Sequence, residues 1–464
     1  MRARTLEDII QAQPEFARYL YNRDSAPHAS RRPGASPVPA EWTNWLEEQR
    51  AWRNTAVLFD QSHHMPELFL DGPDALRLLS HVGVNSFEGF RPGQAKQFVG
   101  CTEQGLMIGD CILHHHGARG FELISGMPLL NWIQYQAENG GYDVRVTRDN
   151  DTPTNPTRQR TSFRFGMDGP NAAAIFAEAV DGNVPEIPFF QTARVRIAGC
   201  QVLALRHGMA GHQGVELSGA YVDGPRVRER LLEVGAQHGL KPGGAKAYFS
   251  SVIESGWIAY PLPAIYTDPA LEAYRRWLPA TGWEARMTLG GSFFSANLDD
   301  YYVNPFEMGY GRIVKFDHDF IGREALEAMA HKPQRRKVTL IWNRADVVSI
   351  FDSLFGDGLP YKYLELPTAN YGFPHTDTVL DGAGRRVGIA RGASYTANER
   401  AMASLAIVEP EHAEPGTELT LMWGEPDGGS AKPNVPRHRQ LAVRVTVAPV
   451  PFASTVQRMK RAWI

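Results

Sequence analysis

Short apolar runs and amphipathic stretches alternate along the first half of the chain. Between residues 54 and 150, apolar blocks predict the strands "AVLFD", "ELFLDG" and "FELISG". Apolar positions three and four apart predict helices over "DALRLLSHV" and "MPLLNWIQYQAENG". The second helix should end at Gly140 and Gly141, because glycine commonly terminates helices. Strands mixed with helices in this way indicate an α+β region.

The same order of elements recurs over residues 161–239. A strand and a helix in "TSFRFGMDGPNAAAIFAEAV" are followed by the strands of "ARVRIAGCQVLALRHG" and the helix of "GPRVRERLLEVGAQHG". This repetition predicts two related α/β lobes that face each other.

A connector rich in Pro and aromatic residues, "YPLPAIYTDP", leads to "NPFEMGYGRIVKFDHDFIGREALEAMA", whose helix should begin near Gly322. Beyond residue 335 the chain consists of strands joined by turn residues, which predicts a small β-barrel or sandwich. These strands are "KVTLIW", "TVLDGAGRRVGIARGASY", "MASLAIVE", "ELTLMW" and "QLAVRVTV". We therefore expect a bilobed region over residues 1–335 and a C-terminal β-barrel domain over residues 336–464.

The first 24 residues have early acids and no apolar core, so they predict a short amphipathic helix rather than a signal peptide. Residues 25–42 are rich in Pro, Ser and Ala and should form an irregular arm that could lie across a cleft.

Composition and charge exclude several classes of protein. A length of 464 residues with 43% hydrophobic and 21% charged residues is ordinary for a globular protein of two or three domains. The net charge of −3 argues against a nucleic-acid partner, and no apolar run is long enough to span a membrane. Three cysteines without a close pair predict neither a disulfide framework nor a zinc site and fit the cytoplasm.

The stretch "LRHGMAGHQGVEL", residues 205–217, places Glu216 just after three glycines, where a strand should begin. Glu216 could be the outward-facing polar residue of that strand. A dinucleotide loop is disfavoured, because the spacing is G-x-x-G-x-x-G and no helix follows. The third interpretation is an ionised acceptor for a heterocycle with several N–H donors.

Three more residues are candidates for chemistry. Asp110 lies in the apolar strand "GLMIGDCIL", so it is either paired with a buried donor or kept for function. Tyr248 follows a glycine-rich turn, where it is either a core aromatic or a phenol that reaches into a cleft. Trp257 offers a flat face for stacking a ring.

Histidines give little support for a metal. His63 and His64 in "LFDQSHHM" are adjacent and should point to opposite sides of an extended chain, and "HHH" at residues 114–116 is expected at the surface or a sheet edge. We therefore expect no metal. The sequence contains no G-x-S-x-G elbow and no P-loop, which argues against a serine hydrolase and against phosphoryl transfer.

Taken in order, "FDQSHHM", "GLMIGDCIL", the glycine loop leading into "GVEL", and "MGYGRIVKFDHDFIGREAL" resemble the aminomethyltransferase family, the folate-dependent T-protein of the glycine cleavage system and its relatives. Within that family, "WRNTAVLFDQSHHM", "ESGWIAYPLPAIYTD", "GGSFFSANLDDYYVNP" and "HDFIGREALEA" are similar to the tetrahydrofolate-dependent aromatic O-demethylases of bacterial lignin-aromatic catabolism.

The resemblance implies a T-protein-like fold around a central folate channel, with tetrahydrofolate as cofactor and a small methoxylated aromatic acid as substrate. It implies cofactor binding by Glu216, Trp257 and Asp110, and substrate binding by Gln61 and His64. Tyr248 matches the proton donor. No metal, membrane or obligatory protein partner is implied. An aminomethyltransferase that docks a lipoyl carrier protein and a non-catalytic folate-binding accessory protein are the alternatives, and the accessory protein's K-G-C-x-x-G-Q-E signature is absent.

One position departs from the family pattern. Vanillate-type demethylases have an arginine for the substrate carboxylate just before the helix that contains "NW", and Gly126 stands at that place here. A missing side chain should enlarge the pocket, which favours syringate, with its second methoxyl group, over vanillate and 3-O-methylgallate. Arg31, Arg32 or Arg119 could supply the cation instead.

Overall fold

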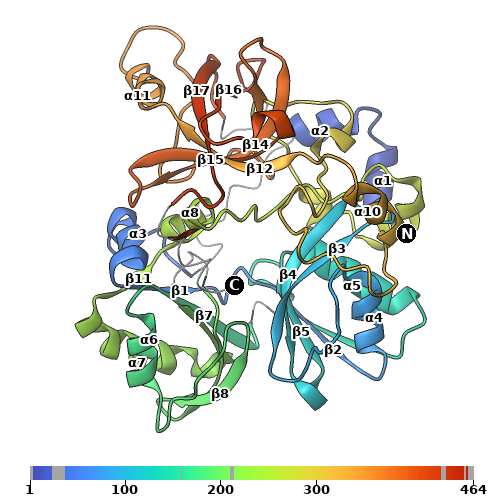
Figure 1. The fold of residues 1–464 in the computed structure, drawn as a ribbon, viewed down its shortest axis with the longest axis vertical. Helices are drawn as coiled ribbons and strands as arrows, with labels where there is room; N and C mark the ends of the chain where they lie inside the picture. Colours follow the sequence, from blue (N-terminus) through green and yellow to red (C-terminus); the bar gives the residue numbers. More distant parts are fainter. Residues whose placement is uncertain are drawn as a thin grey trace.

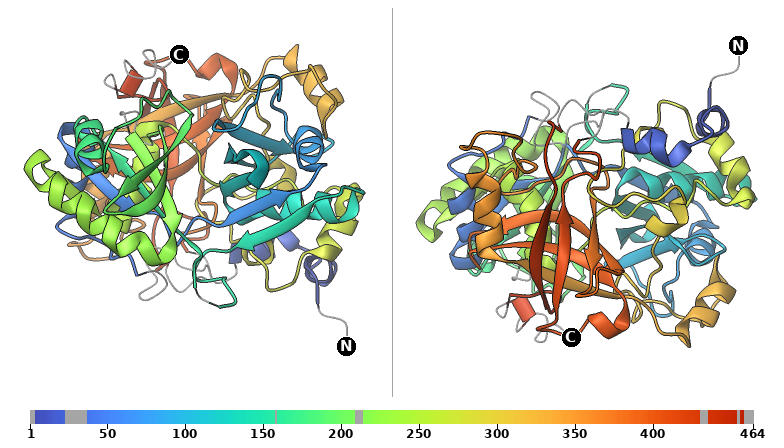
Figure 2. Two further views of the ribbon diagram at one scale, coloured as in Figure 1. Left: turned by 90° about the horizontal axis from the view of Figure 1, so that it is seen from below. Right: turned by 90° about the horizontal axis from the view of Figure 1, so that it is seen from above.

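The computed structural model describes residues 4–22, 37–157, 159–208, 214–429, 435–453 and 456–457. In Figure 1 a closed β-barrel lies above two lobes, each built from a sheet with helices, and the lobes lie side by side below it. The views from below and above in Figure 2 show the same three bodies packed around the centre of the molecule. The predicted α+β class, with two lobes and a C-terminal barrel, is confirmed.

The first lobe is a five-stranded antiparallel sheet in the order β3-β4-β5-β2-β6. Its strands are β2 (Glu67–Asp71), β3 (Ala95–Cys101), β4 (Met107–His115), β5 (Phe121–Ser125) and β6 (Arg145–Asp149). The helices α4 (Ala75–Val82) and α5 (Met127–Asn139) bury their apolar sides in this lobe. The helix α5 ends at Gly140, as the sequence predicted.

The second lobe is a six-stranded sheet in the order β11-β1-β7-β10-β9-β8, covered by α6 (Ala172–Ala179) and α7 (Gly224–Gly235). Its strands are β1 (Ala56–Asp60), β7 (Ser162–Asp168), β8 (Thr192–Ile197), β9 (Cys200–Leu205), β10 (Gly214–Ala220) and β11 (Leu240–Gly243). The strand "AVLFD" was expected in the first repeat, and this was wrong. It is β1, which lies between β7 and β11 of the second sheet.

The barrel closes in the order β12-β15-β14-β13-β16-β17. Its strands are β12 (Arg336–Trp342), β13 (Thr376–Leu380), β14 (Arg386–Thr396), β15 (Ala401–Val408), β16 (Glu418–Trp423) and β17 (Leu441–Ala448), with α11 (Arg344–Asp352) outside. Closure pairs all six strands and leaves no free sheet edge. The domain boundary expected between residues 335 and 336 stays a prediction, and β12 begins at Arg336.

Helix α8 (Ala245–Ser255) connects the second lobe to the barrel, next to α3 (Trp45–Asn54). The fully buried carboxylate of Glu254 accepts hydrogen bonds from Trp52 Nε1 at 3.0 Å and Arg53 Nη2 at 2.8 Å, both on α3. Asn398, in the loop after β14, donates to the same carboxylate at 2.9 Å. These contacts fix α8, and with it Tyr248, against α3 and the barrel.

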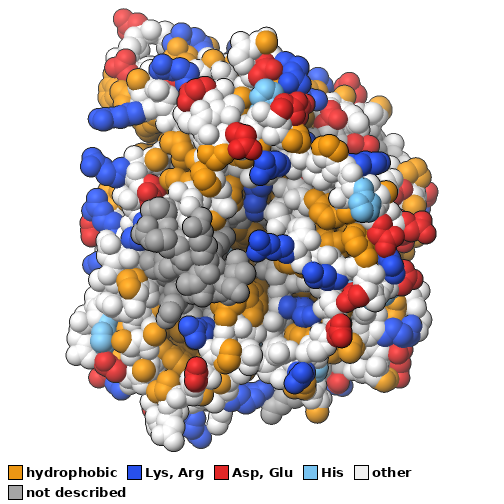
Figure 3. Space-filling view, in the orientation of Figure 1, with side chains coloured by type: hydrophobic (Ala, Val, Ile, Leu, Met, Phe, Trp, Pro, Cys, Tyr) orange, Lys and Arg blue, Asp and Glu red, His pale blue; other side chains and the backbone are white. Residues whose placement is uncertain are grey.

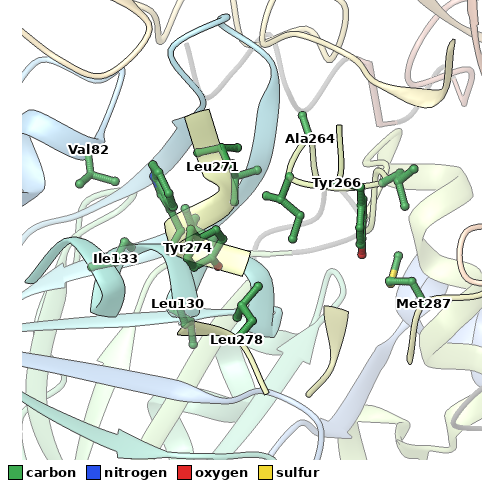
Figure 4. Packing of buried hydrophobic residues seen from close by; sticks show 14 of the residues in the cluster. Val82, Leu130, Ile133, Ala264, Tyr266, Leu271, Tyr274, Leu278 and Met287 are labelled. Atoms are coloured by element: carbon green, nitrogen blue, oxygen red, sulfur yellow. The ribbon is translucent and has the colours of Figure 1, made fainter. Parts of the chain in front are cut away.

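The chain between α8 and the barrel crosses the first lobe and carries α9 (Glu272–Trp277) and α10 (Arg323–Ala330). Tyr274 and Leu278 lie in one apolar cluster with Leu130 and Ile133 of α5 (Figure 4). Gly322, with φ of +86°, precedes α10, as predicted from the sequence.

Two short helices form the N-terminal segment, α1 (Leu6–Gln11) and α2 (Phe16–Asn22), where the sequence analysis expected one. The break falls at Pro14, because proline lacks an N–H and its ring clashes with the preceding helical turn. Of the arm expected over 25–42, residues 25–36 lie outside the described residues. The described end of the arm covers the start of α8, where Pro39 O accepts a hydrogen bond from Ala245 N at 3.0 Å.

On the face shown in Figure 3, acidic and basic side chains are interspersed. Within the described ranges, none of the helices has the length and apolar character needed to cross a membrane.

Candidate active site

A cavity of about 460 Å³ lies where the two lobes, α8, the connector and β12 meet. Five of the six residues predicted to form the site line it, namely Gln61, Asp110, Glu216, Tyr248 and Trp257. Aliphatic and aromatic side chains supply most of the remaining wall, among them Ile112, Ile124, Phe189, Phe190, Tyr260, Met308 and Tyr310. A concave, largely apolar site with a few polar groups is typical of small-molecule binding.

Tyr248 lies on α8 with its ring fixed by aromatic neighbours and its hydroxyl at the cavity. Its ring makes edge contacts with Phe59, at 5.2 Å between centroids, and with Phe249, at 5.3 Å. Gln61 Nε2 donates to the hydroxyl at 3.5 Å, and the hydroxyl donates to none of the described residues. Burial, together with the nearby Tyr260 and Glu216, raises the pKa of Tyr248 well above its usual range. The phenol therefore stays protonated and its hydrogen is available.

His64 is the predicted site residue that does not line the cavity. Its ring packs edge-on against Tyr248, with centroids 4.6 Å apart, and tilts against Phe249 at 5.7 Å. His64 therefore supports the position of the Tyr248 ring.

Asp110 lies on β4 and is 6% exposed. Trp257 Nε1 and Tyr310 OH both donate to Oδ2, each at 3.0 Å, and Gln97 Nε2 donates to the same oxygen at 2.5 Å. Burial raises the pKa of Asp110 to about 6, although these hydrogen bonds lower it. No described residue donates to Oδ1, so one carboxylate oxygen remains for a ligand.

Glu216 lies on β10 and is 8% exposed, so the outward-facing interpretation of its strand is wrong. Its Oε1 is 2.8 Å from His207 Nδ1, and its Oε2 is 3.8 Å from Arg164 Nη1. Burial alone would favour the neutral acid, but His207 and Arg164 outweigh it and lower the pKa of Glu216. For His207 burial opposes the charge, and Glu216 outweighs it and raises the pKa. The cavity thus presents an ionised carboxylate.

The histidines at 114–116 were expected at the surface or an edge, and for His114 this was wrong. Its strand β4 lies between β3 and β5, and the side chain is 1% exposed. His116 Nε2 and Arg164 Nη2 contact the two oxygens of Glu122 at 2.6 and 2.7 Å. His114, His116 and Glu122 are close enough to bind a metal, but the carboxylate already has a partner on each oxygen. We interpret the cluster as part of a buried ion network.

Sequence analysis missed His207, Tyr260, Tyr310 and Lys337, which also line the cavity. The aromatic residues lie in apolar segments, where core packing is the more common role. Lys337 is the second residue of the barrel strand β12, and no local sequence pattern links that strand to the lobes. His207 could have been predicted from the sequence, because it lies in the glycine-rich stretch before Glu216.

The space expected at Gly126 is partly filled. A Cβ added at Gly126 would lie 2.9 Å from Tyr260 Cε1, so the phenol ring occupies the room beside this glycine. Of the arginines considered for a substrate carboxylate, Arg31 and Arg32 lie outside the described residues, as does the side chain of Arg119.

Comparison with known proteins identifies the family. Residues 24–278 match the family described as the GCVT N-terminal domain. The chain is 42% identical over 455 residues to a syringate O-demethylase from Sphingobium sp. (strain NBRC 103272 / SYK-6), with 98% of this chain and 97% of that protein covered. The chain belongs to the aminomethyltransferase (GCVT) family. As a member of this family it is a tetrahydrofolate-dependent methyltransferase, which confirms the predicted enzyme class and cofactor.

Two more relatives of this aminomethyltransferase-family enzyme cover most of its length. It is 30% identical over 432 residues to a sesamin methylene transferase from Sinomonas sp. (strain No.22), with 89% of this chain and 90% of that protein covered. The crystal structure of glycine cleavage system aminomethyltransferase T from Bartonella henselae superposes with a TM-score of 0.61 at 18% identity, covering 95% of this chain and 96% of that one. The likeness to the Bartonella henselae structure shows that the two chains share a fold.

Proposed function

We propose that this enzyme is an aromatic O-demethylase that transfers the methyl group of a methoxylated aromatic acid to N5 of tetrahydrofolate. The products are 5-methyltetrahydrofolate and a phenol. Syringate is the first candidate substrate, since syringate O-demethylase is 42% identical; vanillate and 3-O-methylgallate follow. The observation that carries the proposal is a single cavity that presents the protonated phenol of Tyr248 and the carboxylates of Glu216 and Asp110.

The cavity fits tetrahydrofolate in its donor set. Glu216 is held ionised by His207 and Arg164, and a carboxylate is the matching acceptor for the amino and ring N–H groups of a pterin. Trp257 is fixed by its hydrogen bond to Asp110, and its ring offers a flat face beside the Asp110 carboxylate. We assign Glu216, Asp110 and Trp257 to cofactor binding.

Tyr248 is proposed as the general acid. An aryl methyl ether is unreactive because phenoxide is a poor leaving group, so a proton delivered to the ether oxygen as the carbon–oxygen bond breaks lowers the barrier. Gln61 donates to the Tyr248 oxygen, which leaves the phenol hydrogen free to point at substrate. The apolar surroundings keep that hydrogen on the phenol until it is needed.

The enzyme also accepts the proton that N5 loses and positions the reacting atoms. When bound, tetrahydrofolate supplies N5 as the nucleophile that accepts the methyl group and gives up its proton. Asp110 has an oxygen open to the cavity and a pKa of about 6, so near neutral pH it is mostly ionised and able to accept a proton. Holding the reacting atoms in line in the cavity is worth roughly 7–11 kcal/mol at best.

The proposed partner is a small aromatic molecule. Glycine-cleavage-type aminomethyl transfer is the alternative within the family, and the aminomethyltransferases compared are only 18–26% identical. The cytoplasmic location and the lack of an obligatory protein partner stay predictions.

The test mixes the purified enzyme with tetrahydrofolate and, separately, syringate, vanillate or 3-O-methylgallate, and measures 5-methyltetrahydrofolate by mass spectrometry. We expect methyl transfer from at least one arene, fastest from syringate. Product from none of them, under conditions where tetrahydrofolate binds, would refute the proposed reaction.

A further inference from the structure

Tyr260 is a second phenol in the cavity, and the proposed reaction assigns it no role. It follows Trp257 by three residues on the connector, is half-buried, and lines the cavity together with Tyr248. Tyr260 and Tyr248 line the same cavity, and Tyr260 is among the groups that, after burial, raise the pKa of Tyr248.

The ring of Tyr260 is held in place from two sides. Phe373 packs against it at 4.8 Å between centroids, and Trp283 lies at 6.3 Å. On the cavity side, a Cβ at Gly126 would come within 2.9 Å of Cε1, a separation that real side chains do not tolerate. The ring therefore takes its place because residue 126 has no side chain.

The hydroxyl of Tyr260 makes no hydrogen bond to any described residue, and it is not sealed in the protein interior. Burial, with Asp151 and Asp110 nearby, raises the pKa of Tyr260 to about 12. A phenol in this state keeps its proton and can donate it to an acceptor in the cavity.

The cations of the cavity contact other side chains. Among the cavity-lining residues that the structure describes, the cations are His207 and Lys337. His207 is paired with Glu216, and Lys337 lies over Tyr310, 6.0 Å from its ring centroid, on the side of Asp110. Next to Gly126, the Ser125 hydroxyl donates to Asp110 O at 2.5 Å, whereas the Tyr260 phenol faces the cavity without a hydrogen bond to a described residue.

We propose that Tyr260 is a specificity-determining residue, whose hydroxyl donates a hydrogen bond to an oxygen of the arene other than the ether that is cleaved. This inference rests on the proposed O-demethylase function. Two substrate oxygens have suitable chemistry, namely the carboxylate and the ring hydroxyl next to the methoxyl groups. Both are acceptors, and substrate analogues distinguish them.

The experiment tests two forms of the enzyme on three arenes. Wild type and Tyr260→Phe are compared on syringate, on 2,6-dimethoxyphenol, which lacks the carboxylate, and on 3,5-dimethoxybenzoate, which lacks the ring hydroxyl. An analogue that is not turned over is measured by its inhibition constant against syringate. We expect kcat/KM for syringate to fall about 10- to 100-fold in the variant, the scale of losing one hydrogen bond to a charged group.

For the analogue that lacks the contacted oxygen, wild type and variant should behave alike, and that analogue identifies the oxygen. Gly126→Ala keeps the Tyr260 hydroxyl, but its Cβ should displace the Tyr260 ring. This variant should therefore show the same losses across the three arenes as Tyr260→Phe. Tyr266→Phe is the matched control: it removes a hydroxyl that donates to Glu284 O at 3.0 Å outside the cavity, and its effect should be equal on all three arenes.

An unchanged kcat/KM for syringate in Tyr260→Phe, or an equal loss on all three arenes, would overturn the inference while leaving the demethylase function intact. Inactive wild type with every arene would instead reject the proposed function and this inference together.

Discussion

At the scale of single residues, Tyr248 allows the sharpest test, because its ring and its hydroxyl have separate tasks. Tyr248→Phe keeps the contacts with Phe59 and His64 and removes the proposed proton donor. We expect kcat to fall about 10²- to 10⁴-fold, the usual range for losing a general acid, with the dissociation constant for tetrahydrofolate changed less than about twofold. Single-turnover kinetics and a binding titration measure the two quantities. A variant with unaltered kcat would exclude Tyr248 as the acid.

Asp110 should give the reaction a pH dependence. Burial raises its pKa to about 6, so the carboxylate form accumulates as the pH rises through that value. If the carboxylate accepts the proton, kcat/KM should rise between about pH 5 and pH 7 and then level off. In Asp110→Asn the rate should be lower and this rise should be absent. The check is a pH profile of both proteins, and a rise that persists in the Asn variant would assign it to another group.

The sequence was informative about site residues whose chemistry conflicts with their surroundings. Asp110 and Glu216 could be singled out because acids within apolar strands are costly to bury and need a reason to be there. Tyr260 and Tyr310 could not, because an aromatic residue in an apolar segment is compatible with ordinary packing. His114 shows the converse error, since its burial depends on β3, β5 and the neighbouring lobe, which its local pattern does not contain.

At the scale of elements, periodicity located strands and helices but not their partners. The run "AVLFD" reads as a strand from its composition, yet its place between β7 and β11 depends on pairings with residues more than 100 positions away. The barrel could be predicted more easily, because its strands are apolar runs bounded by turn residues, and the pairs β13–β14, β14–β15 and β16–β17 are neighbours both in sequence and in the sheet.

The end of α8 determines how Tyr248 and Trp257 face the same cavity. Gly256 ends the helix with φ of +73°, and a Cβ there would lie 2.3 Å from Val450 Cγ1. Gly256→Ala should cost about 1–2 kcal/mol for the left-handed backbone alone, and more for the contact. It should also weaken tetrahydrofolate binding, because Trp257 is the next residue. Chemical denaturation and a fluorescence titration measure the two effects.

Gly141→Ala is the control for the cost of placing alanine in a left-handed backbone conformation. Gly141 has φ of +70° at the end of α5, and an added Cβ would meet nothing within 4 Å. This variant should lose about 1–2 kcal/mol of stability and keep its affinity for tetrahydrofolate. Equal affinity losses in both variants would show that Gly256 has no special influence on the site.

At the scale of the whole molecule, one buried arginine links the lobes to each other and to the cavity. Arg164 of β7 in the second lobe contacts Glu67 at 3.1 Å and Glu122 at 2.7 Å, which belong to β2 and β5 of the first lobe. The same guanidinium lies 3.8 Å from Glu216 at the cavity wall. Arg164, which together with His207 keeps Glu216 ionised, therefore also holds the two sheets together.

Arg164→Met should therefore affect stability and cofactor binding together. Removing the guanidinium leaves two buried carboxylates with fewer partners, and breaking a buried ion pair in this way typically costs about 3–5 kcal/mol. Among the described residues, His207 is then the close cation left beside Glu216, so the pKa of Glu216 should rise and the affinity of the enzyme for a pterin should fall. Arg145→Met removes an arginine from the exposed pair with Asp71, whose side chains are 76% and 47% exposed, and should cost at most about 1 kcal/mol. Urea unfolding and tetrahydrofolate titration of both variants test this link between lobe packing and the site. Arg164→Met should lose both stability and affinity for tetrahydrofolate. Arg145→Met should lose neither.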